Sequence, residues 1–228
     1  MTNFLSVCDI LGYSGKSYTE HSISYEFNNK GFRDTEFEKN SILFFGCSYG
    51  FGVGVNSTER YTNLLESKLK IRCNNLCIPG SGSDTTARIL PYWIEKLQPK
   101  IVVNHFMFPI RREISNGDQA PTLWLPSMDL PKTKIQEFIN EDYVYRKTVE
   151  NIWNIKKCCN DNSVRYIEYS KNVNDFKAGD SKHPGSESHK QMANELFDII
   201  ENNYVPEFSN TDDYNNKHIY RQIQKFTV

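Results

Sequence analysis

Apolar residues along the chain form short continuous runs that alternate with stretches of helical periodicity. The run 42–46 (ILFFG) is continuous and ends in glycine, which is typical of a strand buried on both faces of a parallel sheet. The other predicted strands cover 71–78, 101–107 and 164–169. Apolar positions at helical spacing predict helices over about 59–70, 85–97, much of 132–159 and 186–202.

Hydroxyl and acidic side chains stand where the predicted helices begin. Ser57 or Thr58 can cap the first helix, Asp84 the second and Ser186 the last. A side-chain oxygen at these positions accepts a hydrogen bond from a backbone N–H that the helix leaves unpaired. About nine loop residues are then expected between Ser48 and the first helix.

Strands that alternate with helices predict an α/β fold, a three-layer sandwich with a central parallel sheet covered by helices on both faces. Such sheets carry their sites in loops at the carboxyl ends of the strands. We expect one domain over 1–204, with a lead-in over 1–40 and a long active-site loop over 108–131 that holds four prolines. Residues 205–228 are polar and are expected to form a loosely held tail.

Composition narrows the class of protein. The 13% aromatic share compensates for a modest 38% of hydrophobic residues, so the chain can build a core. The net charge is −1 and no stretch concentrates Lys and Arg, which argues against a nucleic-acid partner. No apolar run approaches the roughly 20 residues of a membrane span. The first residues lack a secretory pattern, so a cytoplasmic location is expected.

The cysteines form no regular framework, and we expect all of them to be reduced, with Cys47 buried beneath the serine loop. They are Cys8, Cys47, Cys73, Cys77, Cys158 and Cys159. The Cys73/Cys77 spacing is not followed by a second pair with ligand spacing, so no metal site is expected.

The first group of residues with catalytic potential is 46–52 (GCSYGFG). Ser48 follows a buried strand, so its hydroxyl is expected at the carboxyl edge of the sheet. Small neighbours let the backbone turn sharply and direct N–H groups inward, where a developing oxyanion needs donors. The alternative is a glycine-rich turn in which the serine only bonds the backbone.

Other glycine-rich motifs fit this segment less well. It matches the Gly-x-Ser-x-Gly elbow of α/β-hydrolases, but only one clear strand precedes Ser48 and a loop is expected after it. In the dinucleotide fingerprint read from Gly50, the third glycine would fall on Val55. No phosphate-loop motif occurs in the chain.

The second group is 180–184 (DSKHP), just before the last predicted helix. A serine hydroxyl becomes a good nucleophile only when a base takes its proton, and histidine does so near neutral pH when a carboxylate orients it. Asp180 and His183 can both face Ser48 or contact each other. The alternative is a turn residue followed by an exposed histidine.

Together these motifs resemble the SGNH (GDSL-like) serine hydrolase superfamily over about residues 25–202. That family has a serine after its first strand in a Gly-x-Ser context and Asp-x-x-His before its last helix. The continuation His-Pro-x-x-x-x-His-x-x-x-Ala and the lead-in 28–34 (NNKGFRD) are also similar to the family. The resemblance implies a flavodoxin-like sandwich and the catalytic triad Ser48, Asp180 and His183.

The resemblance also implies oxyanion donors from Ser48 and from a glycine after the second strand, for which Gly80 is the first choice and Gly82 the second. The family's Gly-x-Asn-Asp block is absent, and Asn104 lies inside its strand, too early to reach the site. Arg111 or Arg112 can supply positive charge there. The long loop should border the site, so Arg111, Arg112 and Trp124 are expected to shape substrate preference.

The expected reaction is hydrolysis of a carboxylic ester through an acyl-enzyme, without a cofactor. The substrate would be a small-molecule or carbohydrate ester, such as an O-acetyl group. Two alternatives remain open at this point: an acyltransferase that uses the same triad, and a binding or structural module on a catalytically weak scaffold of this type. The histidines His21, His105 and His218 lack partner patterns and are interpreted as structural, and His189 as a packing or capping residue. The sequence does not indicate an oligomeric state.

Overall fold

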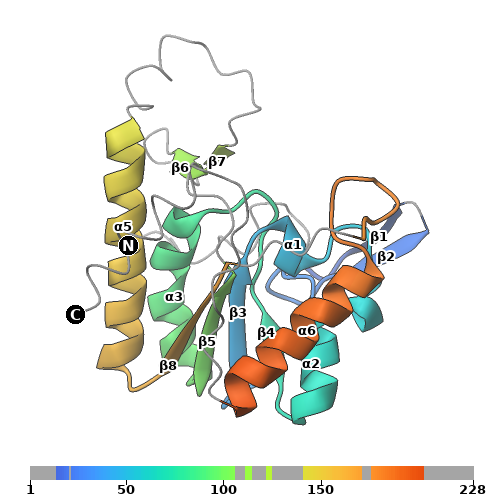
Figure 1. The fold of residues 1–228 in the computed structure, drawn as a ribbon, viewed down its shortest axis with the longest axis horizontal. Coiled ribbons are helices and arrows are strands. Elements are labelled where there is room, and N and C mark those ends of the chain that lie inside the picture. Colours follow the sequence, from blue (N-terminus) through green and yellow to red (C-terminus); the bar gives the residue numbers. More distant parts are fainter. Residues whose placement is uncertain are drawn as a thin grey trace.

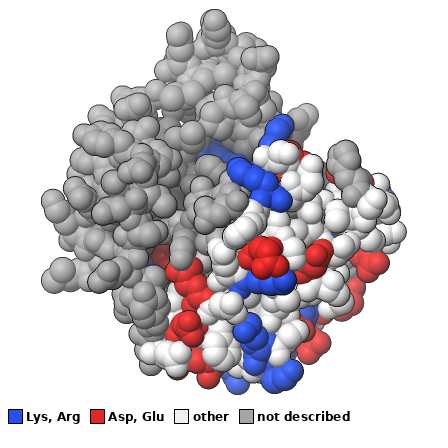
Figure 2. All heavy atoms as spheres, turned by 45° about the vertical axis from the view of Figure 1, so that its right-hand side comes forward, with Lys and Arg blue, Asp and Glu red and all other residues white. Residues whose placement is uncertain are grey.

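The computed structural model describes residues 14–20, 22–105, 111–114, 122–124, 141–170 and 176–202. The expected tail, Cys8, His21, His218 and most of the long loop 108–131 lie outside these residues. No helix within the described part combines the length and apolar character that a membrane crossing requires. On the face that Figure 2 shows, acidic and basic side chains of the described residues are interspersed.

A parallel sheet of four strands lies at the centre of the molecule. Its order is β4-β3-β5-β8. The strands are β3 (Ile42–Gly46), β4 (Cys73–Asn75), β5 (Ile101–His105) and β8 (Arg165–Tyr169). Gly46 lies opposite His105, which lies opposite Tyr169, so three of the strands end side by side.

Helices cover both faces of this sheet, which confirms the predicted α/β three-layer fold (Figure 1). The helix pair on one face is α2 (Tyr61–Leu69) and α6 (Ser186–Glu201), and the pair on the other is α3 (Ser83–Leu97) and α5 (Glu141–Asp161). Alternation along β3 explains the two layers. Ile42 and Phe44 pack in the core with α2 and α6, whereas Leu43 and Phe45 pack with α3 and α5. Each layer therefore buries a full set of apolar side chains, which is the main stabilising contribution to such a fold.

The predicted bounds differ from the observed ones where regular hydrogen bonding stops. The strand predicted over 71–78 is reduced to Cys73–Asn75, although Leu76 and Ile78 still donate to the carbonyls of Phe44 and Gly46 at 2.8 Å. The helix caps also differ from the prediction. Gly82 and Gly185 occupy the extended cap positions, which leaves Asp84 and Ser186 inside the first turns. Asn56 caps a short 3-10 turn, η2 (Ser57–Glu59), before α2.

Short elements account for the remaining differences. The helix α1 (Ser48–Phe51) begins directly at the serine, so the expectation of about nine loop residues there was wrong. A hairpin of β1 (Ser17–Glu20) and β2 (Ile23–Glu26) lies in the lead-in, where the Tyr18 and Tyr25 rings stack at 4.7 Å. Another antiparallel pair, β6 (Arg112–Ile114) and β7 (Thr122–Trp124), lies within the long loop. Elements of three or four residues leave too little periodic pattern to be recognised.

Candidate active site

Ser48 is the first residue of α1, immediately after β3 and the cap residue Cys47. Its side chain is largely buried, since the residue is 7% exposed. The helix has a single turn and ends at Gly52, whose φ of 80° is the left-handed conformation that glycine adopts at low cost. The hydroxyl therefore belongs to a fixed turn at the carboxyl edge of the sheet.

Two glycines around Ser48 are required by close packing. A Cβ on Gly46 would lie 2.9 Å from the carbonyl oxygen of His105, on the neighbouring strand. A Cβ on Gly50 would lie 2.3 Å from Cys77 Sγ and 2.9 Å from the Tyr61 hydroxyl. The glycines thus let the serine turn pack against β5, α2 and the segment that follows β4.

Asp180 and His183 lie on a short loop before α6, and the carboxylate holds the histidine at two points. Oδ1 of Asp180 accepts the backbone N–H groups of Lys182 and His183, both at 3.0 Å. Oδ2 is hydrogen-bonded to Nδ1 of the His183 ring. The loop is closed by a hydrogen bond of 2.8 Å from the Ala178 N–H to the His183 carbonyl.

These hydrogen bonds lower the pKa of the Asp180 carboxyl group. Partial burial would raise the pKa of Asp180, but the hydrogen bonds from the His183 backbone and ring and from Lys182 lower it to about 2. The carboxylate is therefore ionised at neutral pH, and in the neutral form of the His183 ring the Nδ1–H donates a hydrogen bond to it. Nε2 then carries the free lone pair that a general base needs.

The loop that carries Asp180 and His183 packs against the serine turn. The ring of Tyr49, which follows Ser48, meets the His183 ring edge-on with centroids 5.9 Å apart. A Cβ on Gly54 would lie 2.6 Å from the Ala178 Cβ and 4.0 Å from Oδ1 of Asp180. Two segments from opposite ends of the described chain therefore meet at this edge.

The hydrogen bond between Ser48 Oγ and His183 is not among those formed in the described part of the chain. Only the Asp180–His183 half of the predicted triad is hydrogen-bonded in this structure. Such bonds are often long in a protein without substrate and shorten when the substrate binds. The contact of Ser48 with His183 stays a prediction.

The loop after β4 lies beside the serine turn. The carbonyl of Gly46 accepts two hydrogen bonds from it, at 2.8 Å from the Ile78 N–H and at 2.7 Å from the Ser81 hydroxyl. Gly80 has φ 81° and Gly82 is the cap of α3. Within the described residues, neither glycine donates its N–H to a protein atom, and their role as oxyanion donors stays a prediction.

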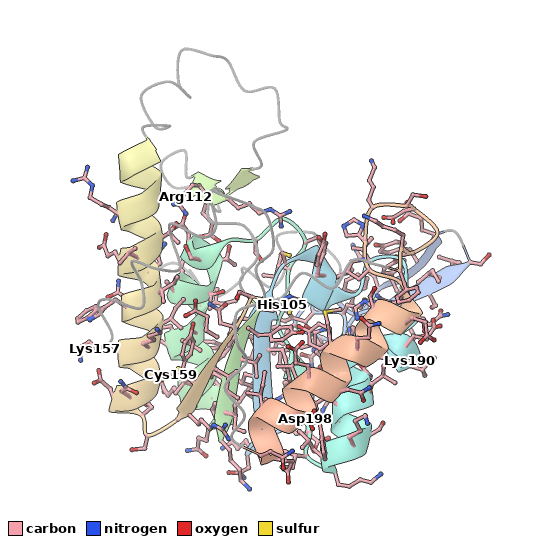
Figure 3. The ribbon with its side chains drawn as sticks, viewed as in Figure 1. His105, Arg112, Lys157, Cys159, Lys190 and Asp198 are labelled. Carbon is pink, nitrogen blue, oxygen red and sulfur yellow. The ribbon has the colours of Figure 1, made fainter. Side chains whose placement is uncertain are left out.

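Asn104 and His105 end β5 on opposite faces of the sheet. The Asn104 amide donates to the Tyr166 hydroxyl at 3.3 Å, inside the layer beside α3 and α5, and its oxygen accepts the Thr86 hydroxyl at 3.5 Å. That Asn104 lies too early on its strand to reach the site stays a prediction. His105 is buried, and its Nδ1 lies 3.2 Å from the Tyr61 hydroxyl (Figure 3). Its ring also meets that of Tyr49 edge-on, so it packs beneath the site.

The two adjacent arginines have different surroundings. Arg112 Nη2 donates to the Thr148 hydroxyl at 2.7 Å, and Nη1 donates to the Arg111 carbonyl at 3.0 Å, which fastens β6 to α5. That carbonyl would lie 2.4 Å from a Cβ on Gly82, so Arg111 packs directly over the glycine loop. Arg111, one of the predicted substrate-shaping residues, therefore contacts a candidate oxyanion donor.

The pKa of Tyr49 responds to charged groups near the serine turn. Burial raises the pKa of Tyr49, Cys47 and Asp180 add to this effect, and Arg111 opposes it. Both Arg111 and Asp180 are thus within electrostatic reach of its phenol. The side chain of Trp124 lies outside the described residues, and its backbone pairs with Arg112.

No group of three His, Cys, Asp or Glu side chains among the described residues could hold a metal ion. The five cysteines that the structure describes are free thiols, and Cys47 is buried as predicted. Burial raises the pKa of Cys73 and of Cys77, so both stay protonated. His189 packs and caps as predicted, since its Nδ1 accepts the Tyr61 N–H at 3.2 Å.

The sequence analysis did not predict that Tyr49 contacts the His183 ring or that Arg33 binds the end of α1. Tyr49 could have been suspected, because it follows the candidate nucleophile directly. Arg33 is 2% exposed and bonds carbonyls at the end of α1. The only signal for it was the similarity of the lead-in to the family, which says nothing of what an arginine there contacts.

No protein-family model and no curated protein matches the chain. Among solved structures it is similar to the psychrotrophic esterase EstA from Pseudoalteromonas sp., at 17% identity and a TM-score of 0.42, over 72% of this chain and 98% of that one. It is also similar to a carbohydrate esterase with "divergent catalytic and non-catalytic binding functions", at 13% identity and a TM-score of 0.49, over 81% and 69% of the two chains.

A third similar structure is a lipolytic protein of the G-D-S-L family from Desulfitobacterium hafniense, at 12% identity and a TM-score of 0.38, over 71% of this chain and 99% of that one. Two of these structures are thus described as esterases, and the third as a lipolytic protein of the G-D-S-L family. At such identities and TM-scores, the assignment of the site rests on the contacts of this chain's own residues.

Proposed function

We propose that the chain is a serine esterase that hydrolyses small carboxylic esters through an acyl-enzyme. One observation carries the proposal: the Asp180 carboxylate binds both the backbone and the ring of His183, on a loop packed against the serine turn. An ionised aspartate that fixes the tautomer of a histidine beside a serine at the edge of a sheet is the arrangement that acyl transfer requires.

In the proposed reaction, Ser48 Oγ bonds the ester carbonyl carbon while its proton passes to Nε2 of His183. The carbonyl electron pair moves to oxygen, and the backbone N–H groups of Ser48 and Gly80, or of Gly82, stabilise the oxyanion. Collapse expels the alcohol, which takes the proton from His183. Water then attacks the acyl group with His183 as base, which releases the acid and restores Ser48.

Asp180 stabilises the imidazolium that forms in both steps. Its low pKa keeps it ionised throughout, so it orients the ring and supplies charge without accepting the proton. The Arg111 backbone packs against Gly82, and the charge of its side chain acts on the Tyr49 phenol, so in this proposal it favours negative charge on the substrate or the oxyanion. Small acyl esters are the substrate class, and O-acetyl groups on carbohydrates are the first natural candidates to assay.

The test is hydrolysis of nitrophenyl acetate by the wild type, Ser48→Ala, His183→Ala and the double variant. Each single change should lower kcat by on the order of a thousandfold. The double variant should be no slower than Ser48→Ala, because the base then has no nucleophile to activate. Circular dichroism checks that all four proteins are folded.

Two outcomes would contradict the proposal. Full activity in Ser48→Ala would exclude a serine nucleophile, and effects that multiply in the double variant would show that the two residues act independently. Turnover that requires an added alcohol acceptor would assign the site to acyl transfer instead of hydrolysis.

A further inference from the structure

Arg33, a buried side chain of the lead-in, binds the end of the serine turn. Arg33 Nη1 donates to the Phe51 carbonyl at 3.2 Å and to the Gly52 carbonyl. Its Nη2 donates to the Val55 carbonyl at 2.8 Å and to the Ser24 carbonyl at 2.9 Å. Three of these four acceptors belong to the end of α1 and the loop that follows it.

The guanidinium is buried without a compensating carboxylate. Among the described residues, no acidic side chain forms an ion pair with Arg33. Burial first, and then the charge of Arg60, lower the pKa of Arg33 to about 10, so it remains charged at neutral pH. The Tyr25 ring lies 4.1 Å from the guanidinium carbon, and a ring face stabilises such a cation. A buried charge is costly, and here it is offset by carbonyls and an aromatic face.

The helix α1 needs such a partner because it has only one turn. Forming a first turn fixes several backbone dihedrals for few hydrogen bonds, so an isolated turn is unstable. The carbonyls at a helix end also lack partners within the helix. Arg33 supplies those partners and holds the end of α1 in place.

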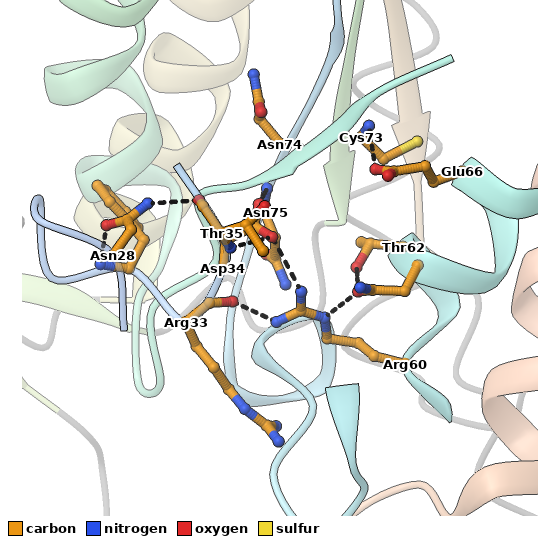
Figure 4. Close-up of polar contacts among 12 residues, drawn as sticks. Asn28, Arg33, Asp34, Thr35, Arg60, Thr62, Glu66, Cys73, Asn74 and Asn75 are labelled. Carbon is orange, nitrogen blue, oxygen red and sulfur yellow. Dashed lines mark hydrogen bonds and ion pairs between the residues drawn. The ribbon is translucent and has the colours of Figure 1, made fainter. Parts of the chain in front are cut away.

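The adjacent residue, Asp34, binds Asn75 of β4 (Figure 4), and Asn75 in turn binds α1. Asp34 Oδ2 accepts the Asn75 N–H at 2.8 Å, and its Oδ1 pairs with Arg72 at 3.1 Å. The Asn75 amide donates to the Gly50 carbonyl at 2.8 Å, and its oxygen accepts the Cys77 N–H at 3.0 Å. Residues 33 and 34 therefore connect α1 with the segment that leads to the Gly80 loop.

We propose that Arg33 is a positioning residue for the reaction. By fixing the end of α1 it keeps Ser48 Oγ and the Ser48 N–H in register with the oxyanion donors after β4. This inference rests on the proposed esterase function. It predicts that replacing Arg33 lowers kcat even where the protein stays folded, because small displacements of reacting groups lower rates steeply.

The test compares Arg33→Met and Arg33→Lys with the matched control Arg165→Met. Arg165 likewise donates to carbonyls at a helix end, although it is an exposed residue: it binds the Ile200 and Ile199 carbonyls, at 3.0 and 2.9 Å, at the end of α6 and from the amino end of β8. For each protein we would measure the melting temperature, kcat and KM for nitrophenyl acetate, the pH profile of kcat, and the rate of labelling by a fluorophosphonate probe.

We expect Arg33→Met to lower kcat and the labelling rate by about 100-fold, the size of effect that a misplaced reacting group causes. KM and the midpoint of the pH profile should stay close to wild type, because neither the binding surface nor the histidine is altered. Arg33→Lys, which keeps the charge with fewer donors, should give an intermediate rate. Arg165→Met should lower the melting temperature and leave kcat unchanged.

A lowered melting temperature with wild-type kcat in both Arg33 variants, assayed well below unfolding, would overturn the inference. An equal loss of kcat in Arg165→Met would also overturn it. If Arg33→Met does not fold, Arg33→Lys alone decides. Failure of the proposed function would be distinguishable, because the wild-type protein itself would then neither hydrolyse the ester nor react with the probe at Ser48.

Discussion

At the scale of single residues, the two oxygens of Asp180 have separate roles. Oδ1 closes the turn by accepting two backbone N–H groups, and Oδ2 holds the His183 ring. One side chain thus stabilises the loop and orients the His183 ring. The same bonds favour the ionised carboxylate, so its contribution to stability depends on pH.

The pH dependence of stability should reveal the role of Asp180. Its pKa is lowered from 3.8 to about 2, so its stabilising contribution is complete above about pH 4 and is lost as the pH falls towards 2. Asp180→Asn should therefore be less stable than wild type at neutral pH. The difference in free energy of unfolding, measured in urea, should shrink from pH 4 downward.

Asp161→Asn is the matched control for this measurement. Asp161 is an exposed partner of Lys157 four residues earlier on α5, and such surface pairs contribute little. A difference for Asp180→Asn that stays constant over the acid range would contradict the account of this carboxylate.

At the scale of elements, α6 and α2 are joined through a buried histidine. His189 on α6 accepts the N–H of Tyr61, the first residue of α2, and its ring stacks on that of Tyr61 at 5.7 Å. The bond satisfies one N–H that the start of a helix leaves unpaired. It also requires a neutral imidazole, because a protonated ring has no lone pair to accept with.

The hydrogen bond between His189 of α6 and Tyr61 of α2 should be lost in acid. Burial first, and then the charges of Arg60, His105 and Arg33, lower the pKa of His189 from 6.5 to about 3. Between these values the unfolded chain binds a proton that the folded protein does not, so stability falls as the pH is lowered. His189→Asn can still accept the N–H but cannot titrate, so its melting temperature should depend less on pH between 7 and 4. An unchanged pH slope would show that His189 is not the titrating group.

The elements that the sequence predicted are the ones with long apolar patterns. The runs that became β3, β5 and β8 and the four long helices follow from burial, which imposes a period on every residue of an element. The helix α1 and the two hairpins are too short for a period to emerge. The Asp-x-x-His loop was predictable because its contacts are local. The role of Arg33 was not, because its partners lie 9 to 22 residues away and are backbone carbonyls, which leave no trace in the sequence.

At the scale of the whole molecule, the site is assembled from loops at one edge of the sheet. The register that places Gly46, His105 and Tyr169 side by side brings these loops together. The serine turn follows β3, the glycine loop follows β4, Arg111 follows β5, and the segment with Asp180 and His183 follows β8. The fold therefore gathers residues from distant parts of the chain, as expected for a parallel sheet.

The central claim is that Ser48 is a nucleophile activated by His183 and Asp180. The most direct measurement is reaction with a fluorophosphonate probe, followed by mass spectrometry of the intact protein and of its peptides. We predict one adduct per chain, on Ser48, formed far more slowly in His183→Ala and not at all in Ser48→Ala. A folded wild-type protein that gains no adduct, or gains it on another residue, would contradict the account.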